Sequence, residues 1–328
     1  MQFELTFQRI CAFVSVITNS LLMFLILGKS PPQLGTYKWL MLYTSLYELV
    51  YTSMNIFVEP STGTFQSSCY MFQDMKKSMF GADGTLFFIL IYCSCYGFSM
   101  SIFACHFIYR YGNVNTIFKQ KYISGKKHLF LYIAPLLSGF VWGLVTWLTM
   151  HESSSKTSFL KIHFEQVLKL NIEECAYVAF WFWPVDEHGE FQPDLISFLG
   201  FGIMILILSW SFISVVYFGF NCYKYISKQM GSLSSQSQAL KSLQAQLFYS
   251  LIFQTAIPCV LMYLPAGIIL SVPMFNVGFN LEVPLLSITI AIYPAIDPLP
   301  TIFIIKSYRR GLIDMFRCHK KTLIVASS

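Results

Sequence analysis

The sequence predicts an all-α membrane protein, a bundle of seven transmembrane helices, and two observations carry this prediction. Only 12% of the 328 residues are charged, while 55% are hydrophobic. A soluble domain carries about 25% charged residues, so a water-soluble chain of this composition would expose large apolar patches. The apolar residues also gather into stretches of about 20, the length that a helix needs to cross the hydrocarbon core. These features exclude soluble, disordered and collagen-like proteins.

The apolar stretches define a single seven-transmembrane domain over residues 1–328. They end at proline, glycine or charged residues, for example at Glu59-Pro60 and Gly125-Lys126-Lys127. We expect spans over residues 8–28, 38–58, 85–109, 129–149, 195–220, 247–270 and 283–305, followed by a cytoplasmic tail over 306–328. The apolar segment 176–184 is too short to cross the membrane and is expected to pack within a long loop.

The basic residues predict the orientation of the bundle. With the N-terminus outside, the inner segments hold 16 of the 22 Lys and Arg residues. Cytoplasmic loops of membrane proteins carry such an excess, so the C-terminus is expected inside and the protein at the plasma membrane. The basic inner surface is then expected to meet anionic lipid and the acidic surface of a cytoplasmic partner rather than nucleic acid.

Cysteine spacing gives no sign of a metal site. No Cys-x-x-Cys pair or Cys/His ligand spacing occurs, and neither a nucleotide-binding loop nor a nucleophile elbow is present. The sequence therefore predicts no metal, no cofactor and no enzymatic activity. Cys69 and Cys175 both lie in outer loops of the predicted topology. An oxidising compartment allows a disulfide between them; the alternative is that the two thiols remain separate.

Three polar residues lie at a similar depth inside predicted spans. Counting 1.5 Å per residue from the inner ends places Asn19 at roughly 14 Å, Glu48 at roughly 15 Å and Asp297 at roughly 12 Å. Ionisable groups in a span face the bundle interior, so we expect these three to form one hydrogen-bonded cluster. Such a cluster could hold helices together, repack on activation or bind an ion.

The third span carries a stripe of aromatic and polar residues at helical spacing, ending in a basic group. Its outer part suits a small-molecule pocket and its inner end suits an effector contact, although ordinary helix packing is the alternative for each residue. Prolines in the sixth and seventh spans are expected to kink these helices. The stripe consists of Phe88, Tyr92, Tyr96, Ser99, Phe103, His106 and Arg110.

These residues resemble a known family. Seven spans with Tyr109-Arg110-Tyr111 closing the third resemble G-protein-coupled receptors. The longer segment 106–111, His-Phe-Ile-Tyr-Arg-Tyr, resembles the nematode Str-class serpentine chemoreceptors, the group that includes the diacetyl odorant receptor. Segments 35–41, 246–248, 254–258 and 294–298 match the same class, so the resemblance extends from about residue 10 to 315.

The resemblance implies roles for residues at the inner end. Arg110 is similar to the arginine of the receptor Asp-Arg-Tyr motif, but Tyr109 stands where that motif has an acid. Asp297-Pro298 resembles the activation motif of the seventh helix, with Phe303 in the place of its tyrosine. The residues expected to take part in G-protein coupling and activation are His106, Tyr109, Arg110, Tyr111, Asp297 and Pro298.

The chain beyond the last span also resembles the receptor family. Residues 307–316 are similar to the short amphipathic helix of these receptors. Cys318 is a candidate for palmitoylation, and an unmodified thiol is the alternative.

The resemblance implies an olfactory-type chemosensory receptor in the cilium of a sensory neuron. No acid lies in the outer halves of the third, fifth, sixth and seventh spans, so a neutral or volatile ligand fits better there than an amine. An ion-coupled transporter or ligand-gated channel that uses Glu48 and Asp297 is the alternative. The side chains expected to line the ligand pocket are Phe88, Tyr92, Tyr96, Met204, Tyr263 and Tyr293.

Overall fold

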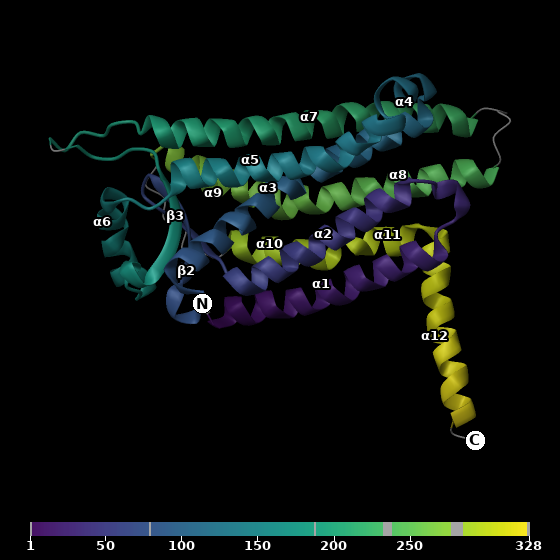
Figure 1. Ribbon diagram of the computed structural model, residues 1–328, viewed down its shortest axis with the longest axis horizontal. Helices are drawn as coiled ribbons and strands as arrows, with labels where there is room; N and C mark the ends of the chain where they lie inside the picture. Colours follow the sequence, from purple (N-terminus) through teal and green to yellow (C-terminus); the bar gives the residue numbers. More distant parts are fainter. Residues whose placement is uncertain (1, 79, 187, 232–237, 277–284, 327–328) are drawn as a thin grey trace.

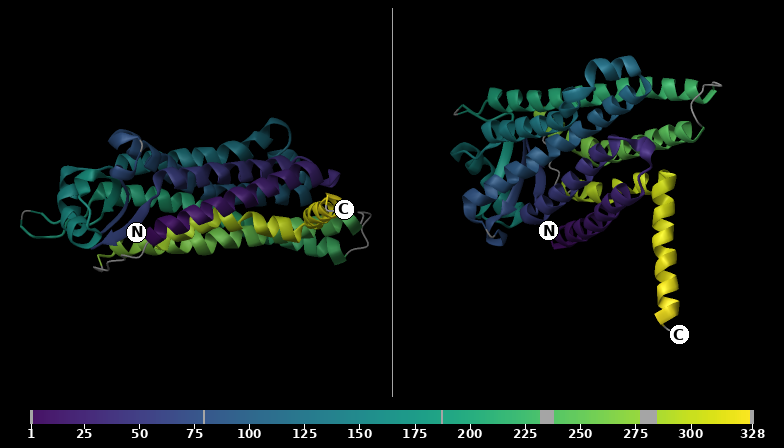
Figure 2. Two further views of the ribbon diagram at one scale, coloured as in Figure 1. Left: turned by 90° about the horizontal axis from the view of Figure 1, so that it is seen from below. Right: turned by 45° about the vertical axis from the view of Figure 1, so that its right-hand side comes forward.

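The computed structural model describes residues 2–78, 80–186, 188–231, 238–276 and 285–326. Seven helical segments lie side by side along the longest axis of the molecule (Figure 1). One end of the bundle, near the N-terminus, carries three strands and the helix α6; we call these elements the cap. The opposite end, which we call the tail end, carries the short helix α4 and the C-terminal helix α12 (Figures 1 and 2).

The first five spanning segments are continuous helices, whereas the last two are broken. Each of the seven ranges expected from the sequence falls largely within one of these segments, and residues 283 and 284 lie outside the described residues. The continuous helices are α1 (Gln2–Lys29), α2 (Tyr37–Val58), α3 (Gly81–Val114), α5 (Phe130–Met150) and α7 (Leu195–Gly231). The sixth segment comprises α8 (Gln238–Pro258), a π-helical turn η6 (Cys259–Tyr263) and α9 (Leu264–Met274), and the seventh comprises α10 (Leu285–Ile296) and α11 (Pro298–Ile304).

Among the described residues, six helical segments are long and apolar enough to cross a membrane, and α2 is not one of these six. The reason is a polar stripe along one face of α2, formed by Thr44, Glu48, Tyr51 and Asn55, which are all buried. These residues recur at helical spacing and face α1, α3 and α10 rather than lipid. The low hydropathy of α2 therefore reflects a polar interior face and is consistent with a seventh spanning helix.

Prolines cause the breaks in the sixth and seventh segments. A proline has no N–H to donate, so it leaves a carbonyl one turn earlier without its helical partner. Pro258 immediately precedes the π-helical turn η6, and Pro298 follows the break between α10 and α11. Both segments that were expected to be kinked are therefore interrupted next to a proline.

The helix α3 lies at the centre of the bundle and approaches α5 closely. A Cβ atom added to Gly139 of α5 would lie 2.6 Å from the carbonyl oxygen of Ser94, and one added to Gly97 of α3 would lie 2.5 Å from the Cβ of Trp142. Small residues at a membrane helix interface permit such backbone contact. These two glycines fix the distance between α3 and α5.

The cap contains an antiparallel sheet that the sequence did not predict. Its strands β1 (Ser61–Phe65), β2 (Ser68–Asp74) and β3 (Cys175–Trp181) pair in that order. The segment expected to be a loop at 176–184 thus forms most of a strand. Its aromatic and β-branched residues favour a half-buried strand, and pairing with β2 satisfies backbone groups that a buried loop would leave without partners.

The sheet register separates the two outer cysteines, so the structure contradicts the disulfide that the sequence allowed between Cys69 and Cys175 and agrees with the alternative of two separate thiols. Cys69 pairs with Phe180, whereas Cys175 pairs with Asp74 at the far end of the same ladder. Five residues at about 3.3 Å each place the cysteines roughly 16 Å apart along the strands. A disulfide requires Cα atoms within about 7 Å, and none joins these two residues.

Helix α6 (Ser154–His163) covers one face of the sheet and continues into a π-helical turn, η4 (Phe164–Leu168). Phe164 is fully buried and packs against the rings of Phe72 and Tyr70, with centroids 5.0 and 5.4 Å away. Together with Tyr177 these residues belong to a hydrophobic cluster separate from that of the bundle. The cap therefore has a core of its own.

One short helix, α4, and one long helix, α12, complete the tail end. Helix α4 (Thr116–Tyr122) connects α3 to α5, and its first turn is capped by the Asn115 side chain, which accepts a hydrogen bond from the N–H of Phe118. Helix α12 (Lys306–Ala326) leaves the bundle crosswise (Figure 2). It is longer than the expected helix over residues 307–316, and the side chain of Cys318 lies outside the described residues.

The remaining turns are short helical segments at the ends of these elements. They are η1 (Pro32–Leu34), η2 (Met75–Lys77), η3 (Gly125–Leu129) and η5 (Ile172–Glu174).

Candidate functional site

A buried arginine closes α3 at the tail end. Arg110 is 2% exposed, and its Nη2 donates a hydrogen bond to the main-chain carbonyl of Gln244 in α8 at 3.1 Å. The guanidinium carbon lies 5.0 Å from the centre of the Tyr37 ring at the start of α2. A cation over an aromatic face is attracted by the ring quadrupole. Arg110 thus connects α2, α3 and α8 through one ring and one main-chain acceptor.

Two segments that carry the family resemblance, residues 35–41 and 106–111, meet around Arg110. The ring nitrogens of His106 bond the hydroxyls of Tyr37 and Thr44, at 3.0 and 2.8 Å. The Tyr109 hydroxyl bonds that of Thr36 at 2.7 Å. The segment at 35–41 therefore supplies hydroxyl partners to the segment at 106–111, and both nitrogens of the buried His106 ring are satisfied.

Tyr111 does not join this network. Its ring packs against Phe118 of α4 and Phe218 of α7, with centroids 4.9 and 5.5 Å away, and its hydroxyl accepts a hydrogen bond from Asn115. A helical residue next to Arg110 is turned by about 100° from it, so Tyr111 faces α4 and α7 rather than α2 and α8.

Halfway along the bundle, the three polar residues expected to meet do lie together. Asn19, Glu48 and Asp297 are each at most 1% exposed, and Glu48 faces the other two. Gln254 of α8 donates a hydrogen bond to the Asp297 carboxyl at 2.9 Å. A cavity of about 10 Å³ separates these groups from His106, which is space for about one water molecule.

The break at Pro298 explains how Asn19 takes part. In an unbroken helix the N–H of residue 298 would bond the carbonyl of Pro294, but proline has none. The Pro294 carbonyl instead accepts hydrogen bonds from Asn19 at 2.9 Å and from Ser15 at 3.1 Å. Neighbouring helices satisfy a freed carbonyl in this way inside a membrane. Pro298 thereby binds α10 to α1.

The remaining segments that carry the family resemblance also meet in space. Gln254 and Asp297, which belong to segments 254–258 and 294–298, are joined by the hydrogen bond described above. Gln246 accepts a hydrogen bond from the N–H of Lys306 at 2.8 Å and so caps the start of α12. The sixth segment is therefore tied to the seventh at the middle of the bundle and to α12 at the tail end.

Among the residues that the structure describes, the six side chains expected to line a ligand pocket contact different neighbours. Tyr96 and Tyr263 lie where α3 meets the sixth segment, and each hydroxyl donates to a carbonyl across that contact: Tyr96 to Met262 at 3.2 Å and Tyr263 to Met100 at 2.9 Å. Met204 of α7 is buried in the same hydrophobic cluster.

The other members face elsewhere. The Phe88 ring lies 4.5 Å from that of Phe80, Tyr92 lies 5.2 Å from Tyr51, and Tyr293 faces the Glu48 carboxyl. Phe88, Tyr92 and Tyr96, the α3 members of this set, recur every four residues, and each such step turns about 40° around a helix of 3.6 residues per turn. Across these two steps the side chains therefore diverge by about 80° and face different neighbours.

Two residues with contacts at the tail end, Gln244 and Tyr308, could not be identified from the sequence. Gln244 acts through its main-chain carbonyl, which no side-chain pattern reveals. Tyr308 is fully buried and its hydroxyl bonds that of Ser30 at 2.8 Å, whereas Phe303, expected in the place of the motif tyrosine, is 52% exposed. The outward face of Phe303 was readable from helical periodicity; the contact of Tyr308 with α1 was not.

Comparison with known proteins agrees with this arrangement. The family of serpentine seven-transmembrane G-protein-coupled chemoreceptors called Str matches residues 4–313. The Caenorhabditis elegans G-protein coupled receptor str-217 is 32% identical over 95% of this chain and 89% of its own length. The serpentine receptor class r-10 of Caenorhabditis briggsae is 25% identical over 93% of this chain and 88% of its own length, and its Caenorhabditis elegans counterpart is 26% identical over 89% and 84%. The chain therefore belongs to the Str family of serpentine chemoreceptors.

Proposed function

We propose that this receptor binds a small external chemical and activates a heterotrimeric G protein at its tail end. The excess of Lys and Arg in the tail-end segments supports a cap that faces outside and a tail end that faces the cytoplasm. The membrane is then the plasma membrane, and the family resemblance favours the cilium of a sensory neuron.

The contact between Arg110 and Gln244 is the observation that carries this proposal. A movement of α8 away from α3 breaks one hydrogen bond to a main-chain carbonyl and exposes the guanidinium at the tail end. A ligand shifts such an equilibrium only through its different affinity for the two arrangements. The π-helical turn and Pro258 in the sixth segment provide the place where α8 can bend.

The ligand site that we propose lies where Tyr96 and Tyr263 cross between α3 and the sixth segment. Their hydroxyls donate to carbonyls of the opposite segment, so a ligand that inserts there competes with two contacts that hold the segments together. The surroundings of this crossing belong to the hydrophobic cluster of the bundle, which also contains Met204, and an apolar site suits a neutral or volatile compound.

The test compares G-protein activation by wild type and Arg110→Ala in cells exposed to small volatile compounds. We expect the response of Arg110→Ala to fall at least tenfold at equal surface expression, since the residue that meets the G protein is gone. Arg9→Ala removes an exposed arginine at the opposite end of the bundle and serves as the matched control. An N-terminal tag that antibodies detect on intact cells tests the orientation. A normal response from Arg110→Ala at equal surface expression would refute the proposal.

An ion-coupled transporter or channel is the second candidate, favoured by the paired carboxyls beside the small cavity. Two carboxylates buried side by side repel each other, so a proton or cation between Glu48 and Asp297 stabilises the arrangement. Ligand-evoked current or uptake in cells that lack the G protein would support this function, and Glu48→Gln should then abolish it.

A further inference from the structure

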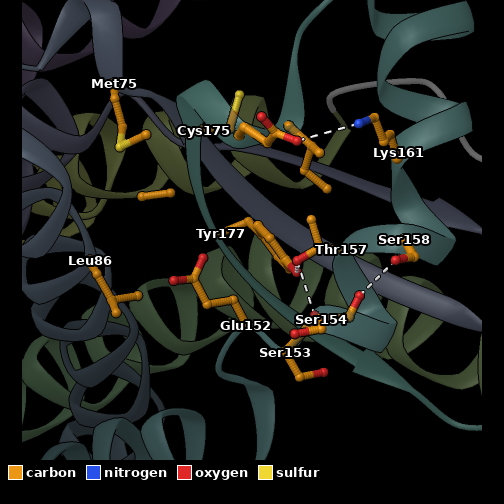
Figure 3. A pocket seen from close by; sticks show the side chains of 13 residues that line it. Met75, Leu86, Glu152, Ser153, Ser154, Thr157, Ser158, Lys161, Cys175 and Tyr177 are labelled. Atoms are coloured by element: carbon orange, nitrogen blue, oxygen red, sulfur yellow. Dashed lines mark hydrogen bonds and ion pairs between the residues drawn. The ribbon is translucent and has the colours of Figure 1, made fainter.

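A large open pocket lies in the cap, outside the seven-helix bundle. Its volume is about 700 Å³, within the range of small-molecule sites. Side chains from α6 and β3 meet those of Met75 and of Leu86, in the first turns of α3, around this space (Figure 3). None of the side chains expected to line a ligand site belongs to it.

The pocket has one polar wall and one apolar wall. The polar wall consists of the hydroxyls of Ser154, Thr157 and Ser158 along α6. The Thr157 hydroxyl bonds that of Tyr177 at 2.7 Å, which fixes α6 against β3. Met75 and Leu86 provide the opposite, apolar wall. A ligand with a hydrocarbon body and a polar end would contact both walls.

One carboxylate on the lining has no counter-ion. Lys161 and Glu173 pair with each other at 3.3 Å. Glu152, by contrast, forms no hydrogen bond or ion pair with any residue that the structure describes, and its side chain extends between Leu86 and Tyr177 (Figure 3). The nearby Lys156 directs its ammonium group to the carbonyls of Thr149 and His151 instead.

The environment of Lys156 explains why it does not neutralise Glu152. Its Nζ lies 3.1 and 3.2 Å from the two carbonyl oxygens, away from the pocket. Burial lowers the pKa of this ammonium group, and its two carbonyl partners hold it where it lies. Among the described side chains of the lining, the charges of Lys161 and Glu173 cancel. Glu152 therefore leaves the lining with one net negative charge.

We propose that this pocket is a binding site for a small organic amine, with Glu152 as the counter-ion of its ammonium group. The hydroxyls of α6 receive the polar substituents of the ligand, and Met75 and Leu86 contact its hydrocarbon part. Charge-assisted hydrogen bonds are roughly twice as strong as neutral ones, so the carboxylate selects a cation over a neutral molecule of the same shape.

The pocket is connected to the tail end through α3. Leu86 lies near the start of this helix and Arg110 near its end, so an occupant of the pocket touches the helix that carries the proposed G-protein contact. This signalling consequence rests on the proposed receptor function, whereas binding of the amine does not.

The experiment measures direct binding of radiolabelled 2-phenylethylamine to the purified full-length receptor in lipid nanodiscs at neutral pH. The competitor 2-phenylethanol has the same hydrocarbon part without the charge. Glu152→Gln is expected to weaken amine binding about tenfold, the loss of one charge-assisted contact, while affinity for the alcohol stays unchanged. Glu165→Gln is the matched control, because this exposed acid follows α6 and lies outside the pocket.

A second variant tests the volume rather than the charge. Ser158→Trp adds bulk at an exposed position of the polar wall and is expected to block the amine and the alcohol alike. Thermal unfolding curves that match wild type show that each variant is folded.

The outcomes separate this site from the proposed function. No saturable amine binding to wild type, or equal affinity of wild type and Glu152→Gln, would overturn the site. Arg110→Ala is expected to bind the amine with wild-type affinity while its G-protein response is lost. Amine binding by a wild-type receptor that activates no G protein would refute the proposed function and leave the site intact.

Discussion

The cap and the tail end of this receptor treat charge in opposite ways. In the cap, Glu152 borders an open pocket of about 700 Å³, and the ion pairs around it are exposed to water. At the tail end, Arg110 is almost fully buried between an aromatic ring and a main-chain carbonyl. A solvated charge is free to accept a ligand, whereas a buried charge with few partners is costly. The exposed carboxylate in the cap therefore suits the binding of a ligand. The buried guanidinium at the tail end suits a contact that breaks when α8 moves away from α3.

The two ends also differ in how they are held together. The tail end belongs to the hydrophobic cluster that runs through the bundle, whereas the cap sheet has two faces: Val178 and Phe180 belong to the bundle cluster, and the opposite face packs in a separate cluster around Phe164. Whether loosening the separate cluster disturbs Arg110 can therefore be tested by a substitution at Phe164.

The largest effect is expected from Phe164→Ala. Removing a fully buried aromatic ring leaves a cavity and costs about 3–5 kcal/mol, so the cap should lose hydrogen-exchange protection over β2 and β3. The matched control is Phe191→Ala, because the Phe191 side chain is 58% exposed. If the two cores are independent, basal G-protein activation stays at the wild-type level. A large change in basal activity would show that the cap and the tail end form one unit.

An intermediate effect is expected from Tyr37→Leu at the tail end. The substitution removes the ring beneath Arg110, which contributes about 1 kcal/mol, and basal G-protein activation should rise about fivefold. Tyr37→Phe keeps the ring and removes only the hydroxyl that bonds His106, so its basal activity should rise less than twofold. A fall in basal activity with Tyr37→Leu would mean that the ring supports the active arrangement.

The smallest effect concerns the loop between β3 and α7, where Asp186 accepts hydrogen bonds from the N–H groups of Glu190 and His188 and from the Gln192 amide. These donors, the Glu190 N–H above all, lower the pKa of Asp186 below its ordinary value of 3.8. A lowered pKa contributes stability above the unfolded value, and this contribution is lost as the pH falls through the folded one.

Exchange protection of the amides of His188 and Glu190, corrected for intrinsic rates, should therefore be constant above about pH 4 and fall below it. Asp186→Asn should remove this pH dependence. Unchanged protection in wild type at low pH would show that the loop is held by other contacts.

The sequence predicted the helices of this receptor better than its cap. A membrane span is an uninterrupted apolar stretch, which is a local and strong signal. The polar stripe of α2 was equally readable, because Glu48 and Asn55 recur at helical spacing and must face the interior of a membrane protein. The segments around Arg110 and Asp297 were each visible along the chain, but their pairing with Thr36 and Gln254 was not.

The cap was not predicted because its strands are short and lie far apart in the sequence. An apolar run such as β3 cannot be distinguished from a loop or helix segment by periodicity, and its partner β2 lies about 100 residues earlier. Two cysteines in outer loops looked able to form a disulfide until the register placed them at opposite ends of one ladder. Similarly, the α3 stripe suggested one pocket, although its residues turn toward different neighbours.

The sequence by itself determined the seven-helix class, the breaks at Pro258 and Pro298 and the inward position of Asn19, Glu48 and Asp297. Each of these follows from the solvent or from the chemistry of one residue: apolar stretches enter lipid, proline lacks an N–H, and polar groups avoid hydrocarbon. Only the tertiary structure decided the acceptor of Arg110, the separation of Cys69 from Cys175 and the open pocket around Glu152. These depend on how distant segments pack, which is set by contacts that no local pattern records.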